Sequence, residues 1–322
     1  MYIKNRGVIP TKLRKYTDIE ITGEINRQSF DANGKGMIKM SGKLYICATP
    51  IGNLEDVTFR VIKTLKEVDL IAAEDTRHSI KLLNYYGIDT PMTSYHEHNK
   101  TEKAKYLVEQ LLSGKNIALI TDAGTPAISD PGEDLVRMAY EAGIEVTSLP
   151  GPCALITGLT LSGLSTRRFS FEAFLPPDKK ERQRIIDEIA DDTRTVILYE
   201  APHRLLKTLK ELYEAMGERN LSVIKELTKI HETVLRTSLS EAIAVFEKEE
   251  PKGEYIIILE GKSMKEIEED QQSRWMEKTV SEHLKMYLDM GLEKKEAMKR
   301  VAKDRGISKR DVYRALLKDD FK

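Results

Sequence analysis

The sequence predicts a two-domain α/β protein, with a mostly parallel sheet in the first domain, a mixed sheet in the second and a small helical tail. Its 322 residues suffice for about two domains at roughly 150 residues each. Hydrophobic residues make up 40% and charged residues 32%, which is typical of a folded chain and argues against wholesale disorder. Short apolar runs alternate with amphipathic stretches, as strands and helices do in α/β proteins.

Composition also bears on the compartment. The longest clean apolar run, Tyr255 to Leu259, is far shorter than the roughly 20 residues of a membrane helix, so we expect no membrane partner. Two cysteines and no apolar segment at the amino end favour a reducing cytoplasm without disulfides.

Residues 1–40 show no sustained apolar period and carry turn formers such as Asn33, Gly34 and Gly36, which predicts a poorly ordered extension. The alternative is an upstream stretch that reflects the choice of start codon, since Met37 and Met40 precede the first convincing strand.

Residues 41–156 form the predicted first α/β domain. The run 44–48 is followed by a Gly turn and by an amphipathic helix, for which Asp56 is a suitable cap. Similar units follow, with strands expected at 70–73, 117–121 and 145–149 and helices at 102–112 and 133–142. This alternation predicts a mostly parallel sheet covered on both faces.

Residues 157–262 form the predicted second domain. After a strand from about Phe169 and the Pro176-Pro177 break, a charged helix is expected at 179–189. Hairpin-like connections predict a mixed sheet, with strands at 195–199, 221–225 and 255–260 and helices at 203–216 and 239–247.

A charged linker, 262–273, leads to a helical tail at 275–322. A turn at Gly306 and a second helix capped by Ser308 give the outline of a helix-turn-helix. Both ends are basic: residues 1–40 carry eight Lys/Arg against four Asp/Glu, and residues 291–322 eleven against six, although the chain as a whole carries −1. Lys309, Arg310 and Arg314 favour a nucleic-acid contact, with a plain helical hairpin and solvated ends as the alternatives.

Ligands of open α/β sheets bind beyond the carboxyl ends of the strands. Four Gly/Pro-rich loops follow strands there and suit a flat cofactor held by main-chain groups. Their candidate cofactor-binding residues are Pro50, Gly52, Asn53, Asp122, Ala123, Gly124, Thr125, Asp130, Pro150, Gly151, Pro152 and Ala154. No G-x-G-x-x-G or Walker lysine loop follows a strand, which counts against nicotinamide and P-loop chemistry.

Polar residues in these loops allow two interpretations. Glu74, Asp75, Asp122 and Asp130 add negative charge that favours a cationic ligand or a metal, but helix capping would account for Asp75 and Asp130. His96-Glu97-His98 has metal-ligand types, yet a polar contact or solvent exposure is the favoured interpretation. Cys153 is favoured as a small buried residue over a nucleophile, because no histidine is placed beside it.

The strand ends of the second domain also carry charge. Glu200, His203 and Arg204 follow one strand, and Lys225, Glu226 and Lys229 follow another. Two domains with such edges can face one cleft, while surface polarity is the simpler alternative.

Seven strings in order give a family resemblance. They are TPIGNLEDVT (49–58), AAEDTRHS (72–79), TDAGTPAISDPG (121–132), LPGPCA (149–154), YEAPHRLL (199–206), KELTKIHE (225–232) and GEYIIILEG (253–261). The chain resembles the ribosomal RNA branch of the tetrapyrrole methylases, the class III S-adenosylmethionine-dependent methyltransferases. Tetrapyrrole-modifying relatives carry G-x-G-x-G-D after the first strand, where this chain has Pro50-Ile51-Gly52-Asn53. Cys153 stands where many members have serine, and residues 1–40 match nothing in the family pattern.

The resemblance implies a tetrapyrrole-methylase-like fold, a cytoplasmic homodimer, S-adenosylmethionine in the interdomain cleft and no metal. It implies 2′-O-methylation of a cytidine in the decoding region of 16S rRNA in the small ribosomal subunit. Tyr199, Glu200 and Pro202 then join the cofactor site. Glu74, Asp75, His78 and Glu226 are the candidate proton acceptors, and Arg77, His203, Arg204, Lys225 and Lys229 the candidate RNA contacts. The alternatives are a methyltransferase for a small molecule or a protein, and a non-enzymatic nucleic-acid-binding regulator.

Overall fold

The structure is a computed structural model that describes residues 29–30, 36–37, 41–273, 275 and 277–319. In residues 1–40 it describes two short strands, β1 (Ser29–Phe30) and β2 (Gly36–Met37), which pair antiparallel. The extension predicted there otherwise lies outside the described residues. Residues 41–322 form a separate unit, which contains every feature below. Among the described residues, no helix is long and apolar enough to cross a membrane.

The first domain contains a five-stranded sheet in the order β5-β4-β6-β3-β7, and every pairing in it is parallel. The strands are β3 (Lys43–Cys47), β4 (Leu70–Ala73), β5 (Met92–Ser94), β6 (Ile117–Ile120) and β7 (Glu145–Leu149). The predicted parallel sheet is therefore confirmed. Only β5 was not expected, because its three half-buried residues form a short edge strand with a weak apolar signal.

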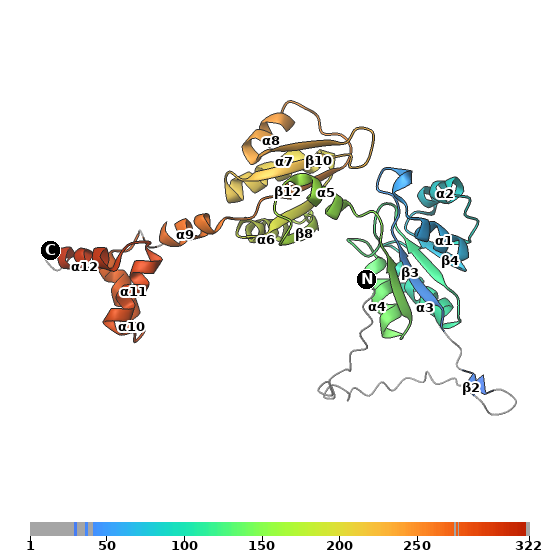
Figure 1. Ribbon diagram of the computed structural model, residues 1–322, viewed down its shortest axis with the longest axis horizontal. Helices are drawn as coiled ribbons and strands as arrows, with labels where there is room; N and C mark the ends of the chain where they lie inside the picture. The colour runs from blue at the N-terminus through green and yellow to red at the C-terminus, as the bar shows by residue number, and fades with distance from the viewer. Residues whose placement is uncertain (1–28, 31–35, 38–40, 274, 276, 320–322) are drawn as a thin grey trace, which may run out of the picture. The chain divides into compact units, whose positions relative to one another are not determined.

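Helices cover both faces of this sheet (Figure 1). They are α1 (Phe59–Glu67), α2 (Thr76–Tyr85), α3 (Lys100–Leu112) and α4 (Gly132–Glu141). Successive residues of β6 alternate between two cores: Ile117 packs into the core under α3 and α4, and Ala118 packs into the core under α1 and α2. The middle of the sheet is thus buried on both sides, which explains the continuous apolar runs of β4 and β6.

The start of α1 differs from the prediction. Asp56 does not cap this helix; it lies in a short 3-10 turn, Leu54–Asp56, which the Asn53 side chain begins by accepting the Glu55 amide. The cap of α1 is Thr58, whose hydroxyl accepts the Val61 amide at 3.2 Å. Two polar residues near one helix start both suit a cap, and the turn decides between them.

The second domain contains a mixed five-stranded sheet in the order β11-β10-β12-β9-β8, as predicted. Its strands are β8 (Phe169–Phe174), β9 (Thr195–Glu200), β10 (Asn220–Lys225), β11 (Thr233–Ser238) and β12 (Tyr255–Leu259). β8 and β9 pair in parallel, while the pairs formed by β10, β11 and β12 are antiparallel. β11 was not predicted, since none of its side chains is fully buried.

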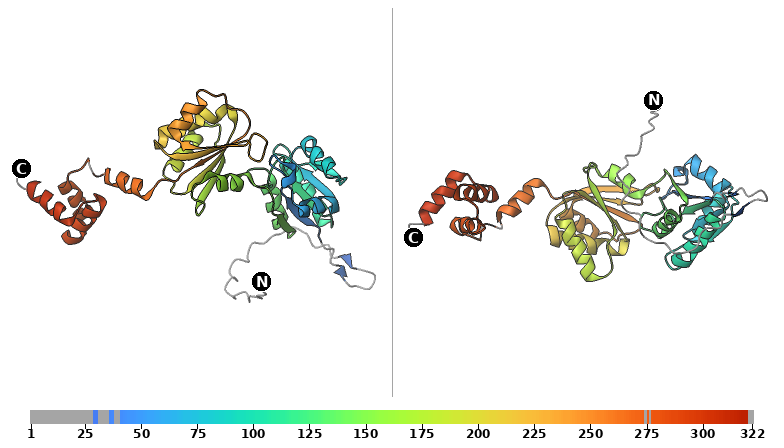
Figure 2. Two further views of the ribbon diagram at one scale, coloured as in Figure 1. Left: turned by 45° about the horizontal axis from the view of Figure 1, so that its top comes forward. Right: turned by 90° about the horizontal axis from the view of Figure 1, so that it is seen from below.

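The helices of this domain divide between the two faces of its sheet (Figures 1 and 2). They are α5 (Ala154–Ser162), α6 (Lys179–Ala190), α7 (Pro202–Met216) and α8 (Leu239–Phe246). α6, α7 and α8 share one core with Val196 and Leu198, and α5 covers the opposite face with Ile197. α5 spans the predicted domain boundary at residues 156 and 157 and packs on the second sheet.

The predicted linker contains a helix, α9 (Met264–Ser273), whose start is capped reciprocally by Ser263 and Glu266. α10 (Val280–Asp289), α11 (Lys294–Asp304) and α12 (Lys309–Asp319) follow and share a core of their own. We call these three helices the C-terminal module. Gly306, at φ +63°, makes the turn between α11 and α12, and Ser308 accepts the Asp311 amide, so the predicted helix, turn and helix are confirmed.

Candidate functional site

Loops that follow the strands of the first sheet meet at its carboxyl edge. Thr49, after β3, exchanges two backbone hydrogen bonds with Gly124, after β6, at 2.9 and 3.0 Å. The Thr49 hydroxyl donates to the Thr121 carbonyl, and the Thr125 hydroxyl donates to the Pro152 carbonyl at 2.9 Å. The structure therefore brings together three loops that the sequence singled out separately.

Two glycines allow these loops to approach closely. A Cβ at Gly151 would lie 2.6 Å from the Cβ of Ala48. A Cβ at Gly52 would lie 2.7 Å from the Thr228 hydroxyl and 2.9 Å from the Leu227 carbonyl, both of which belong to the loop after β10. A side chain at either position would push two loops of the site apart.

The loop between β6 and α4 is held in an unusual backbone conformation. Ala127 and Ser129 both have a φ of +66°, a region that L residues rarely adopt. The Asp130 carboxylate accepts the amides of Ala127 and Gly132 at 2.9 and 2.8 Å and so fixes this conformation. Burial raises the pKa of Asp130. Such stored strain is common at functional sites.

A carboxylate cluster lies beside this loop. The Thr121 hydroxyl donates to the Glu74 carboxylate, and the Asp122 amide lies 3.4 Å from the same oxygen. Asp122 in turn accepts the Asp75 amide at 3.1 Å. Burial raises the pKa of the Asp122 carboxyl, and the nearby charge of Glu74 adds to this rise. A partly desolvated negative cluster can attract a cation or accept a proton.

Asp75 and Arg77 bind each other. Asp75 caps α2 by accepting the Arg77 amide at 2.8 Å, and its carboxylate also accepts two bonds from the Arg77 guanidinium. These bonds lower the pKa of Asp75 to about 2, so it is a weak proton acceptor. His78 is exposed one residue further along α2.

The second sheet contributes strand ends from both chain directions. Because β12 runs antiparallel to β9 and β10, its first residue Tyr255 pairs with Glu200 and with Lys225, the last residues of those strands. The amino end of β12 thus lies at the same edge as the carboxyl ends of β9 and β10. Sequence reasoning that considered carboxyl ends alone missed this contribution.

A cavity of about 340 Å³ is lined by residues of both domains. Seven of the predicted cofactor-binding residues line it, namely Ala123, Gly124, Thr125, Ala154, Tyr199, Glu200 and Pro202. The others, Pro50, Gly52, Asn53, Asp122, Asp130, Pro150, Gly151 and Pro152, do not line it but belong to the same loops or flank them. Lining residues that were not predicted as cofactor contacts are Ile51, Ile128, Cys153, Phe174, Ala201, Leu227, Glu254, Tyr255 and Ile256.

Aromatic rings form part of the cavity wall. Phe174 and Phe171 each meet the Tyr199 ring edge to face, at 5.7 and 4.9 Å between centroids. Burial raises the pKa of Tyr199 to about 12, so its hydroxyl stays protonated. Phe174 ends β8, which is parallel to β9, and the carboxyl-end rule could have found it.

Glu200 and Arg204 are engaged within the second domain. The Glu200 side chain is 1% exposed and accepts the Ala201 amide at 2.9 Å and the Thr208 hydroxyl. Arg204 lies 3.5 Å from Glu200 and donates to the Leu175 carbonyl at 2.5 Å. The carboxylate of Glu200 is therefore not available to a ligand, although the residue lines the cavity. Arg204 is already bound to Glu200 and to the Leu175 carbonyl within the protein.

The loop after β10 carries a second charged group. Lys229 donates to Glu226 at 3.0 Å and to Glu254 at 2.9 Å. Burial tends to raise the pKa of Glu226, but the bonds from Lys229 and the Glu254 amide outweigh it and leave the pKa below its ordinary value. Lys225, the last residue of β10, is half-buried, and His203, in the first turn of the helix after β9, is exposed. Glu226, Lys229, Lys225 and His203 therefore all lie at or beside one edge of the second sheet.

The remaining candidates are less engaged. His96 and His98 lie 6.0 Å apart between ring centroids, and no group of three metal-ligating side chains that could hold an ion occurs among the described residues. The Nδ1 atom of His96 is buried without a partner in the described part of the chain. Cys153 is half-buried, lines the cavity and packs against the apolar core beneath it.

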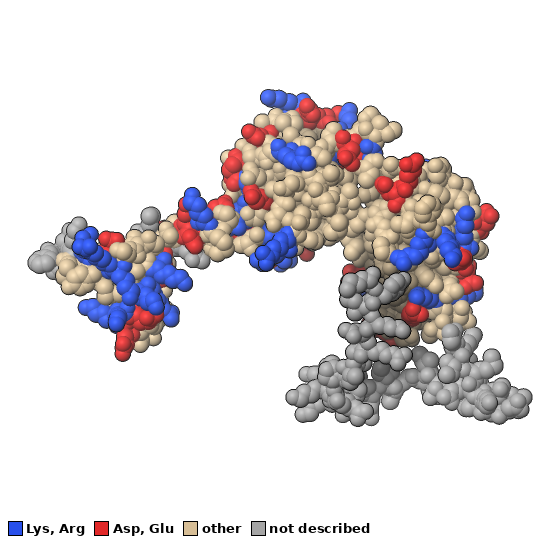
Figure 3. All heavy atoms as spheres, viewed as in Figure 1, with Lys and Arg blue, Asp and Glu red and all other residues tan. Residues whose placement is uncertain are grey.

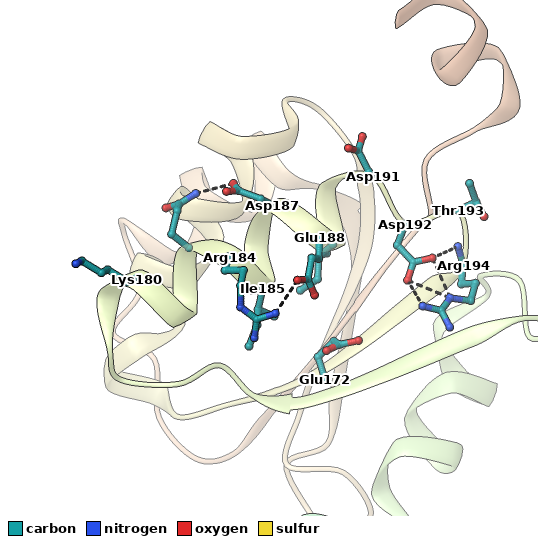
Figure 4. A pocket seen from close by; sticks show the side chains of 12 residues that line it. Glu172, Lys180, Arg184, Ile185, Asp187, Glu188, Asp191, Asp192, Thr193 and Arg194 are labelled. Atoms are coloured by element: carbon teal, nitrogen blue, oxygen red, sulfur yellow. Dashed lines mark hydrogen bonds and ion pairs between the residues drawn. The ribbon is translucent and has the colours of Figure 1, made fainter. Parts of the chain in front are cut away.

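A larger groove of about 970 Å³ runs along α6 and the loop that follows it (Figure 4). Two ion pairs lie within its lining: Arg184 with Glu188 and Arg194 with Asp192, each at 2.7 Å. None of the candidate residues above lines this groove. We therefore assign the functional site to the smaller cavity.

Comparisons with known proteins show which family the chain resembles. The family model for tetrapyrrole (corrin/porphyrin) methylases matches residues 43–243. The chain is 48% identical to ribosomal RNA small subunit methyltransferase I of Halalkalibacterium halodurans, over 84% of this chain and 93% of that protein. It is 45% identical to the protein of that name in Bacillus subtilis, over 90% and 98%.

Among solved structures, the crystal structure of a diphthine synthase matches with a TM-score of 0.54 at 14% identity. The match covers 69% of this chain and 91% of that one. At this identity the similarity supports the fold alone.

Proposed function

Because this chain belongs to the tetrapyrrole (corrin/porphyrin) methylase family, we propose that it transfers the methyl group of S-adenosylmethionine to a cytidine ribose 2′-oxygen in the decoding region of small-subunit ribosomal RNA. The relatives are ribosomal RNA methyltransferases by name, which supports an RNA substrate. The cavity lined by both domains is the observation that supports the proposal most, since its lining includes residues of the loops whose sequences resemble the family.

The residues present fit such a cofactor. The cavity volume lies within the about 300–1,000 Å³ typical of small-molecule sites. The apolar residues Ile51 and Ile128 and the aromatic ring of Phe174 suit a flat base, and the Gly124 main chain can approach it closely. The negative cluster of Glu74 and Asp122 does not line the cavity but adjoins its lining residue Ala123, and its charge has the sign that favours a sulfonium compound. When bound, the cofactor supplies an electrophilic methyl group.

The chain's own residues then have two tasks. They align the ribose with the donor, which in favourable cases contributes up to about 7 to 11 kcal/mol, and they accept the proton that leaves the 2′-hydroxyl. Asp75 and Glu226 are held by Arg77 and Lys229, which makes them poor acceptors. We therefore favour Glu74 and His78 for the proton.

The remaining parts of the proposal concern the setting. Arg77, His203, Lys225 and Lys229 lie at or near the sheet edges of the site, where Lys and Arg can contact RNA phosphate or sugar. We further propose that the protein acts in the cytoplasm, where its ribosomal substrate lies, and as a homodimer.

The test is methyl transfer to small ribosomal subunits that lack the modification. With labelled S-adenosylmethionine, we expect one labelled cytidine ribose, resistant to alkaline cleavage on its 3′ side. Label on a base, on a protein or only on small molecules would overturn the proposal.

A Gly124→Trp variant tests the location of the cofactor. Gly124 has a φ of +87°, and any side chain there is strained and enters the cavity wall. Calorimetry with S-adenosylhomocysteine should show loss of binding to this variant. Tight binding would mean that the cofactor lies elsewhere.

A further inference from the structure

A row of three lysines runs along α11. Lys295, Lys299 and Lys303 are spaced four residues apart, so they share one exposed face of the helix. The opposite face is apolar, and Ala297 and Val301 are buried in the core of the C-terminal module. No described residue forms an ion pair with any of the three lysines, whereas Arg314 pairs with Asp311.

α12 presents a second basic face. Arg310 and Arg314 lie one turn apart, and both are exposed. Beside them, the rings and chains of Tyr313 and Leu317 are 55% and 44% exposed, while Val312 on the other side is fully buried. Tyr313 thus offers an exposed ring on the helix that carries the two guanidinium groups.

Charge on these two helices is strongly one-sided. Residues 294–319 carry ten Lys/Arg against four Asp/Glu. Figure 3 shows Lys and Arg gathered over α11 and α12 on the face that it presents. We call Lys295, Lys299, Lys303, Arg310 and Arg314 the basic face.

Folding alone does not explain the basic face. Like charges four residues apart destabilise a helix, whereas opposite charges at this spacing stabilise it. Elsewhere in the chain the same spacing joins opposite charges, as in Lys63 with Glu67 and Lys265 with Glu269. The row on α11 therefore adds a small repulsion within its own helix, which a negative partner outside the module would offset.

We propose that the basic face is a docking surface for the phosphates of the substrate RNA, separate from the cavity where methyl transfer occurs. This proposal rests on the proposed function, and it assigns the C-terminal module to RNA recognition. Lysine and arginine neutralise backbone phosphates, and Tyr313 can stack on an unpaired base.

Two variants of the full-length protein test the proposal. One carries K295Q, K299Q and K303Q; the other carries R310Q and R314Q. The control carries K66Q, K105Q and K248Q, which removes three exposed lysines from other surfaces for the same change of net charge as the first variant. Binding to a fluorescent fragment of small-subunit ribosomal RNA is measured by anisotropy over a range of salt concentrations.

We expect the first variant to bind RNA about 100-fold more weakly at about 0.1 M salt, and its salt slope to fall by about two, because three phosphate contacts are lost. The second variant should weaken binding by roughly two-thirds as much as the first on a logarithmic scale, because it removes two contacts instead of three. The control should bind RNA as the wild type does. Affinity for S-adenosylhomocysteine, measured by calorimetry, should not change in any variant. Melting of the first variant should occur at the same or a higher temperature, since a repulsive row is removed.

The outcomes separate this proposal from the proposed function. If both variants bind RNA with the wild-type affinity and slope, the docking surface is refuted while methyl transfer stands. If they retain RNA affinity but change oligomeric state, the basic face serves self-association and the proposal is also refuted. Wild-type protein that methylates no ribosomal RNA would refute the proposed function itself.

Discussion

A single methyl group at position 151 would collide with the neighbouring loop of the site. The Cβ of a Gly151→Ala variant would lie 2.6 Å from the Cβ of Ala48, and its next neighbours are 3.7 Å away. Real Cβ atoms essentially never approach this closely, and Ala48 is fully buried after β3, so the loop after β7 must move. That loop carries the Pro152 carbonyl, which accepts the Thr125 hydroxyl of the cavity wall.

The cost follows from the size of the overlap. Inserting a methyl into a well-packed region costs about 1–3 kcal/mol. If displacement of the loop absorbs this cost, the affinity for S-adenosylhomocysteine falls by about 5- to 150-fold, at about 1.4 kcal/mol per factor of ten. Isothermal titration calorimetry measures the change directly.

The clash has one rigid partner, which provides a matched control. An Ala48→Gly/Gly151→Ala double variant removes the Cβ that the new methyl would meet, so its affinity should return to within about threefold of the Ala48→Gly single variant. A Gly151→Ala variant that binds as tightly as the wild type would refute the argument that this close approach shapes the cavity. Loss of binding that Ala48→Gly fails to rescue would refute the assigned clash.

Two further predictions concern stability. Glu200→Gln should lower the free energy of unfolding of the second domain by about 3–5 kcal/mol, because a buried carboxylate that faces two arginines loses its charge. Urea denaturation measures this change. The control Glu188→Gln, on the exposed side of α6, should change the free energy of unfolding by less than about 0.5 kcal/mol. An equal effect of the two would contradict a structural role for the buried carboxylate. Burial and the nearby Arg305 lower the pKa of His283, so the unfolded chain binds a proton more readily and the C-terminal module should lose stability as the pH falls below about 6.5. Fluorescence of Trp275, the chain's one tryptophan, reports unfolding of the module, because its ring stacks on His283 at 3.6 Å. His283→Gln should remove the pH dependence of the melting temperature, and the control His231→Gln should keep it. A melting temperature of the wild type that does not change on acidification would contradict the prediction.

Much of the fold could be predicted because its strands are short apolar runs buried on both faces. β6 and β12 are buried at every position, and both were found. β5 and β11 were not, because neither strand contains a fully buried residue. A strand without one lacks the apolar pattern on which such a prediction depends; the edge strands β7 and β8 each contain a buried position and were found.

The site divides in the same physical way. Loops after parallel strands were predicted, because the carboxyl ends of parallel strands meet at one edge. The contribution of Tyr255 and Ile256 was not, since it depends on β12 running antiparallel, which no local pattern reveals. The partners of Arg204 and Lys229 were also out of reach of the sequence, because Leu175 and Glu254 approach them only after folding.

A crystal structure with S-adenosylhomocysteine bound would test the central claim most directly. We expect the ligand in the cavity lined by Gly124, Ala154 and Tyr199. Density for the ligand in the charged groove along α6, or binding that leaves the cavity empty, would contradict the assignment of the site.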